Sequence, residues 1–190
     1  RIIAGEAAQR FAKVTMELGG KSANIIFNDA NYERALDGAL VSIFANNGQA
    51  CLAGSRILVQ KKIADRFIAD FTARAKNIRI GRPFDEDAEL GPLSSVANMQ
   101  RVLSYADIVR DDGGEILAGG NRVNGFESGC YVEPTVALAK DNKARVCQEE
   151  LFGPFATFLT FETEEEAIAL GNDTRFGLAG YVWTENLQRA

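Results

Sequence analysis

Short apolar runs alternate with amphipathic stretches along most of the sequence, and this alternation limits the fold more than any other feature. Strands are expected at 14–18, 24–27, 57–60, 115–118, 132–138, 155–161 and 178–183. Between them, apolar residues recur at three- and four-residue steps, as in amphipathic helices. These helices are expected at 2–12, 32–44, 63–78, 96–106 and 164–170. Such alternation is typical of α/β proteins, so we expect an open mixed or parallel sheet with flanking helices.

Polar residues suited to N-cap positions precede several of these helices. Residues 28–29 suit the start of the second helix, Ser94 or Ser95 the start of the fourth, and Thr163 the start of the last. Their side-chain oxygens can accept hydrogen bonds from the free N–H groups of the first turn. Three glutamates follow Thr163 directly, as the helix dipole favours.

Both ends of the sequence look like positions within a longer sequence. The chain begins at Arg1, inside a helix-like stretch and without Met, and Thr184 is expected to cap a further helix near its end. We therefore take it as a segment of a longer protein. Its 190 residues are enough for one domain and part of another.

Charge and cysteine usage limit the partners and the compartment. The net charge is −5 with no cluster of Lys and Arg, so neither nucleic acid nor a membrane is expected as a partner. The cysteines at 51, 130 and 147 form neither a disulfide framework nor a C-x-x-C metal pair. These features favour a cytoplasmic protein without a metal site.

The absence of histidine restricts the chemistry further. It excludes Ser-His-Asp and Cys-His catalysis, H-E-x-x-H zinc sites and histidine proton shuttles, unless another chain supplies the group. Any chemistry here must use carboxylates, thiols, lysine, backbone dipoles or a cofactor.

Cys51 is the first candidate for such chemistry. It lies in N-N-G-Q-A-C-L-A-G-S-R at 46–56, after a predicted helix and before a predicted strand. Small neighbours allow a substrate to approach the sulfur, and nearby backbone N–H groups can stabilise a thiolate or an oxyanion. By itself the pattern fits a buried structural cysteine slightly better than a catalytic one.

Two acidic blocks flank this cysteine in the sequence. Glu17 opens E-L-G-G-K-S at 17–22, where two glycines would let backbone pass close to a ligand. A phosphate-binding loop is excluded there, because no glycine stands five positions before Gly20. The second block, Q-E-E-L-F-G-P-F at 148–155, could accept hydrogen bonds from ribose hydroxyls. Taken singly, the blocks also fit a solvated glutamate at a turn and an ordinary acidic loop.

Together the three blocks resemble the aldehyde dehydrogenase superfamily in order and spacing. The matching stretches are E-L-G-G-K-S at 17–22, G-Q-A-C at 48–51 and E-E-L-F-G-P at 149–154. L-G-P-L at 90–93 and N-D-T-R-F-G-L at 172–178 also agree. The resemblance covers essentially the whole chain.

The resemblance implies a role for each block. Cys51 would attack the aldehyde to give a thiohemiacetal and, after hydride transfer, a thioester. Glu17 would activate the water that hydrolyses this thioester. Glu150 would hold the nicotinamide ribose, and Phe152 would pack near the nicotinamide ring. Leu18 and Gly19 would approach the nicotinamide through their backbone.

The resemblance also divides the chain. Residues 1–18 would be the last part of a dinucleotide-binding domain, and residues 19–190 the catalytic domain. The cofactor would be NAD or NADP, the substrate a small-molecule aldehyde, and the full-length protein a homo-oligomer. If the cell makes only these 190 residues, we expect no dehydrogenase activity, because the rest of the cofactor domain is missing.

Two other functions remain open at this point. A relative of the acylating type would pass the acyl group to coenzyme A, although such relatives commonly lack the base that Glu17 would supply. A non-catalytic structural descendant would keep the fold without the chemistry. The presence of Cys51, Glu17 and Glu150 argues against that descendant.

Overall fold

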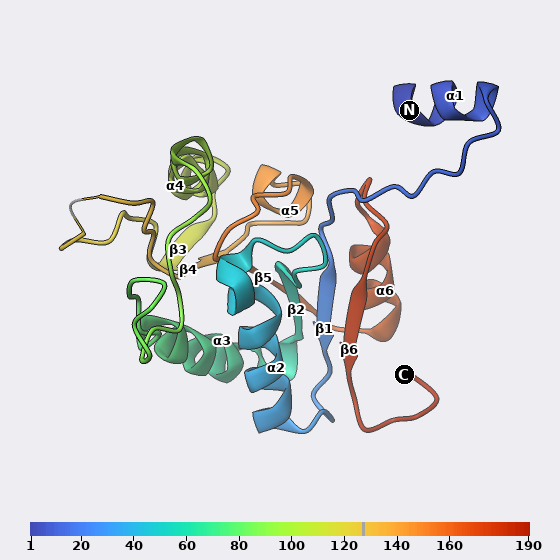
Figure 1. Cartoon of the computed structure of the whole chain (residues 1–190). Helices are drawn as coiled ribbons and strands as arrows, with labels where there is room; N and C mark the ends of the chain where they lie inside the picture. Colours follow the sequence, from blue (N-terminus) through green and yellow to red (C-terminus); the bar gives the residue numbers. More distant parts are fainter. Residues whose placement is uncertain (127) are drawn as a thin grey trace.

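A computed structural model of the chain describes residues 1–126 and 128–190, and these residues form one mixed sheet with helices on both faces (Figure 1). The six strands lie in the order β3-β4-β5-β2-β1-β6, and only β3 is antiparallel to its neighbour. The strand bounds are β1 Ala23–Ile26, β2 Arg56–Gln60, β3 Glu115–Ala118, β4 Thr135–Leu138, β5 Phe155–Phe161 and β6 Gly180–Trp183. The expected α/β class and mixed sheet are confirmed.

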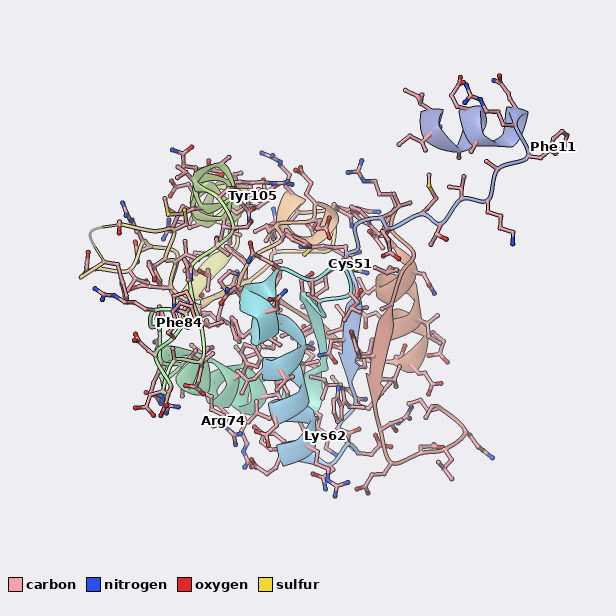
Figure 2. All side chains as sticks on the ribbon, in the orientation of Figure 1. Phe11, Cys51, Lys62, Arg74, Phe84 and Tyr105 are labelled. Carbon is pink, nitrogen blue, oxygen red and sulfur yellow. The ribbon has the colours of Figure 1, made fainter. Side chains whose placement is uncertain are left out.

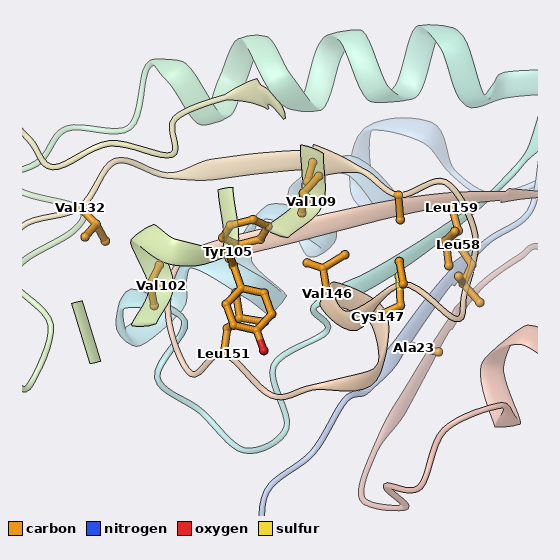
Figure 3. Packing of buried hydrophobic residues seen from close by; sticks show 14 of the residues in the cluster. Ala23, Leu58, Val102, Tyr105, Val109, Val132, Val146, Cys147, Leu151 and Leu159 are labelled. Atoms are coloured by element: carbon orange, nitrogen blue, oxygen red, sulfur yellow. The ribbon is translucent and has the colours of Figure 1, made fainter. Parts of the chain in front are cut away.

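Apart from α1, the helices divide between the two faces of the sheet. Their bounds are α1 Ile2–Gln9, α2 Tyr32–Phe44, α3 Lys61–Lys76, α4 Val96–Asp111, α5 Arg145–Gln148 and α6 Glu164–Asn172. One core joins α2 and α3 to the sheet through buried side chains such as Leu36, Phe71 and Phe158. The other core joins α4, α5 and α6 to the opposite face, with Val102 and Leu58 among its members (Figure 3). No helix of the described residues is long and apolar enough to cross a membrane.

The N-terminal segment departs from the sequence expectation. Residues 14–18 are extended but form no strand, so the strand expected there is wrong. A strand needs a partner for its backbone N–H and C=O groups, and none of the described residues pairs with this stretch. The segment leads from α1, which buries no residue and stands away from the rest of the chain, to Gly19 (Figure 1).

The helix starts are mostly as expected. Ser95 and Thr163 cap α4 and α6, each accepting a hydrogen bond from a backbone N–H of the first turn. The cap of α2 is Asn31 and not residues 28–29, because only Asn31 directly precedes the helix and accepts from the Arg34 N–H. No helix follows Thr184 within the described chain, where its hydroxyl bonds to the Asp29 carboxylate.

The parallel pairing brings four sequence blocks to one edge of the sheet. Residues 19–22, 51–55, 149–154 and 174–179 precede β1, β2, β5 and β6 respectively. The amino ends of neighbouring parallel strands lie at the same edge. Blocks that are far apart in the sequence therefore meet where these four strands begin.

Candidate active site

The turn that carries Cys51 begins where α2 ends. Asn46 and Asn47 have φ values of 53° and 58°, in the left-handed region that stops a helix and that asparagine tolerates better than most residues. The chain then turns back, with the Ala53 N–H donating to the Ala50 carbonyl at 3.1 Å. Cys51 lies half-buried at the tip of this turn. Its backbone N–H makes no hydrogen bond to any residue that the structure describes, so it is free to donate to a ligand.

Side-chain amides hold this turn against the loop before α4. Asn47 accepts a hydrogen bond from the Gly91 N–H at 2.8 Å and donates to the Pro92 carbonyl at 3.2 Å. Gln49 accepts from the Ser94 N–H at 3.0 Å. The amide residues beside Cys51 therefore position the turn.

Gly19 and Gly20 bring the first block against the other two. The Gly20 N–H donates to Glu150 Oε1 at 3.0 Å. A Cβ at Gly20 would lie 2.2 Å from the Cys51 carbonyl oxygen, and a Cβ at Gly19 would lie 2.1 Å from Glu150 Oε2. At Gly20 the close atom belongs to backbone, so only glycine fits there, whereas a side chain at Gly19 would push the Glu150 carboxylate aside. Cys51 accordingly lies near the point where the N-terminal segment leaves the body of the chain (Figure 2).

The two adjacent glutamates of the third block have different surroundings. Glu149 accepts from Arg145 Nε at 2.9 Å and from the Tyr105 hydroxyl of α4. These hydrogen bonds, first that of Arg145 and then that of Tyr105, lower the pKa of Glu149. Glu150 bonds to Gly20 through Oε1, while its Oε2 has no hydrogen-bond partner among the described residues.

Phe152 has an unusual backbone that presents its ring at the surface. Its φ is 59° and the residue is 41% exposed. The Phe152 carbonyl accepts a hydrogen bond from Asn98 Nδ2 at 2.7 Å, which fixes the strained peptide. Next to it, the Gly153 carbonyl lies so close to Gly48 that a Cβ there would be 2.1 Å away. The second and third blocks are thus in direct contact.

Glu17 and Leu18 lie on the exposed segment that precedes Gly19. Leu18 is 65% exposed, and Glu17 makes no hydrogen bond or ion pair with the residues that the structure describes. The structure therefore brings Gly19, Gly20 and Glu150 to the Cys51 turn, but it leaves the side chain of Glu17 in solvent.

Three polar residues at this edge were not identified from the sequence. The Tyr181 hydroxyl of β6 donates to the Leu52 carbonyl at 2.8 Å, and its pKa is raised by burial and by the nearby Cys51. Lys21 and Arg56 are 2% and 1% exposed. Burial lowers the pKa of Lys21 to about 8. In the sequence, Lys21 lies within the block at 17–22 and Arg56 ends the block at 46–56, and both cations adjoin apolar strand residues.

Comparison with known proteins gives one family along the whole chain. A model described as the aldehyde dehydrogenase family matches residues 1–190. The chain is 44% identical over 186 residues to a betaine aldehyde dehydrogenase of Mesorhizobium japonicum, covering 97% of this chain and 38% of that protein.

Solved structures agree with this match. PnpE of Pseudomonas sp. WBC-3 superposes with a TM-score of 0.95 at 49% identity, over 100% of this chain and 39% of PnpE. Betaine aldehyde dehydrogenase of Staphylococcus aureus, solved in complex with NAD+, superposes with a TM-score of 0.94 at 43% identity, over 100% of this chain and 38% of that chain. The chain spans about two fifths of the length of these relatives.

Proposed function

The chain belongs to the aldehyde dehydrogenase family, and from this premise we propose that the full-length protein oxidises an aldehyde to a carboxylic acid with NAD(P)+. One observation carries the proposal. Gly20 touches the Cys51 carbonyl and also donates to Glu150, so the thiol block and the carboxylate block meet at one glycine.

In this proposal Cys51 is the nucleophile. As a thiolate, its sulfur forms a bond to the aldehyde carbon, and the carbonyl electron pair moves to oxygen. The unpaired Cys51 N–H is suited to stabilise this oxyanion. When the electron pair returns, the carbon loses its hydrogen as hydride and a thioester remains on Cys51.

Glu17 is proposed as the general base for the second half of the reaction. It takes a proton from water while the water oxygen attacks the thioester carbon, and the Cys51 sulfur leaves as thiolate. Glu17 lies three residues before Gly20, which itself contacts the Cys51 carbonyl. Its exposed side chain has no competing partner in the described residues, so it is free to turn toward the thioester.

The nicotinamide cofactor supplies the acceptor for the hydride. Glu150 is proposed to hold its ribose, and Phe152 to pack near its ring, with Leu18 and Gly19 approaching through backbone. The residues present fit such a group. Glu150 Oε2 has no hydrogen-bond partner among the described residues, the Phe152 ring is exposed, and the backbone of Gly19 lies against the Glu150 carboxylate. We propose NAD as the cofactor, since two solved relatives, PnpE and the Staphylococcus aureus enzyme, are structures in complex with NAD.

We also propose that residues 1–18 belong to a dinucleotide-binding domain and residues 19–190 to the catalytic domain. In α1 and the following turn, Ile2, Ile3 and Phe11 are 83%, 72% and 97% exposed, which suits a surface that packs against other parts of a larger protein.

The test uses the full-length product of the gene that carries this sequence. Wild-type protein should form NADH from an aldehyde, Cys51→Ala should abolish it, and Cys130→Ala should leave it intact. A fully active Cys51→Ala variant would reject the assignment.

A second variant separates hydrolysis from acyl transfer. Glu17→Gln should still give a single-turnover burst of NADH but lower the steady-state rate by about 10²–10⁴-fold. If the wild type instead stalls at the thioester until coenzyme A is added, the protein belongs with the acylating relatives.

A further inference from the structure

Arg56 is buried at the start of β2 and uses its guanidinium entirely on neutral acceptors. Nε donates to the Lys21 carbonyl at 2.9 Å. Nη1 donates to Asn142 Oδ1 at 3.1 Å and to the Leu170 carbonyl at 2.8 Å, and Nη2 donates to the Gly171 carbonyl at 2.7 Å. Only 1% of the residue is exposed, and none of its hydrogen bonds to the described residues goes to a carboxylate.

These four bonds connect sequence blocks that meet at the candidate active site. Lys21 follows Gly20, the residue that touches the Cys51 carbonyl and bonds to Glu150. The Arg56 N–H also donates to the Ser22 carbonyl at 3.3 Å. Backbone and side chain of Arg56 therefore both hold the segment that contains the two glycines.

Asn142 connects Arg56 to the third block, at 148–155. Its side chain accepts from Arg56, and its own carbonyl accepts from Gln148 Nε2 at 2.6 Å. Gln148 lies two residues before Glu150. The Arg56 guanidinium thus links three segments: the start of β2 after the Cys51 turn, the segment that contains Gly19 and Gly20, and the residues just before Glu150.

The other two hydrogen bonds of the Arg56 guanidinium go to carbonyl groups at the C-terminal end of α6. The Ala169 carbonyl accepts from the Asp173 N–H and the Asn172 carbonyl from the Thr174 N–H. The remaining carbonyls of the last turn, Leu170 and Gly171, accept from Arg56. A cation at a helix C-terminus is favourable, and the planar guanidinium offers donors in several fixed directions, which an ammonium group does not.

We propose that Arg56 is a positioning residue that sets the place of the Gly19–Ser22 segment relative to Cys51, and thereby the reactivity of the Cys51 thiol. It lies five residues beyond Cys51 and contacts no reacting group, so it acts through the backbone that it holds. The inference rests on the proposed function, in which Cys51 is the nucleophile. The alkylation rate of the Cys51 thiol, however, can be measured without aldehyde or cofactor.

The experiment compares Arg56→Lys, Arg56→Met and Phe71→Leu with the wild type in the full-length protein. Phe71 is fully buried in the core on the opposite face, so Phe71→Leu lowers stability without touching the Arg56 contacts. The measurements are the melting temperature and the pH profile of Cys51 alkylation by iodoacetamide, followed by peptide mass spectrometry.

We expect Arg56→Met to slow Cys51 alkylation by on the order of 10- to 100-fold and to change its pH profile, because ångström-scale displacement within a site has effects of this size. Arg56→Lys should fall between Arg56→Met and the wild type. Phe71→Leu should keep the wild-type alkylation profile even if its melting temperature falls as far as that of Arg56→Met.

Two results would overturn the inference. One is a wild-type alkylation profile in a folded Arg56→Met or Arg56→Lys protein, and Arg56→Lys decides the matter where Arg56→Met does not fold. The other is an equal change in Phe71→Leu, which would mean that any loss of stability has the same effect. A wild type without aldehyde oxidation would reject the proposed function alone and leave the comparison of profiles intact.

Discussion

The three cysteines of the chain differ in their access to reagents. Cys51 is half-buried, whereas Cys130 and Cys147 are buried. Burial is the main cause that raises the pKa of Cys147 to about 11, because a thiolate loses its hydration inside the core. Cys147 should therefore remain a protonated, unreactive thiol near neutral pH.

This difference predicts selective labelling. Brief treatment of the native protein with iodoacetamide should modify Cys51 first, since the thiolate is the reactive form and Cys147 is both protonated and covered. Peptide mass spectrometry of the three cysteine sites measures the order. Labelling of Cys147 at the rate of Cys51 in folded protein would contradict it.

Lys21 gives a prediction about pH. Its pKa is lowered from 10.5 to about 8, with burial as the largest cause, so the folded state disfavours the charged form. The resulting loss of stability is full below about pH 8 and disappears as the pH rises toward 10.5. Lys21→Met should therefore stabilise the chain near neutral pH, by at most about 3 kcal/mol, and the gain should shrink at higher pH.

Urea unfolding of wild type and variant across this pH range measures the effect. Lys13→Met is the matched control, because Lys13 is exposed and its removal should give no such trend. A stabilisation by Lys21→Met that does not depend on pH would show that packing, and not charge burial, is responsible.

At the scale of elements, Asn47 stabilises the connection between α2 and β2 in two ways, through its backbone conformation and through its side-chain hydrogen bonds. Asn47 adopts a φ of 58° and its side chain makes both hydrogen bonds to the 91–92 loop. Asn47→Ala should lower the free energy of unfolding by about 1–3 kcal/mol, because it leaves the Gly91 N–H unpaired and places alanine in a left-handed conformation.

Asn47→Gly separates these two contributions. It loses the same hydrogen bonds but adopts the positive φ without strain, so it should be less destabilised than Asn47→Ala. Denaturant unfolding of the two variants gives the order. Equal losses would mean that the backbone conformation contributes nothing at this position.

At the scale of the whole molecule, the sheet and its two cores exclude the N-terminal segment. α1 buries no residue, and residues 11–18 are exposed up to Gly19. A chain that starts at residue 19 should therefore melt within about 1–2 °C of the 190-residue chain, since no core contact is lost.

Differential scanning calorimetry of the two chains tests this. A clearly lower melting temperature for the shorter chain would show that residues 1–18 pack on the sheet, and would count against the proposed domain boundary. Equal melting would support residues 19–190 as a folding unit.

The sequence by itself determined the order and type of most elements. Strands β2 and β5 and helices α2, α3 and α4 could be predicted, because their apolar residues repeat with the period of a strand or a helix over enough positions. The resemblance in the blocks around Glu17, Cys51 and Glu150 was also sufficient to indicate the family.

Only the tertiary structure decided which residues share the site. Parallel pairing brings the amino ends of four strands together, and no local pattern in the sequence encodes that meeting. The same holds for the separation of Glu149 from Glu150 and for the four long-range bonds of Arg56. The strand expected at 14–18 is wrong for a related reason, since a strand depends on a partner that local sequence does not specify. Periodicity reports which face of an element is buried, whereas contacts between distant segments are set by how those faces pack.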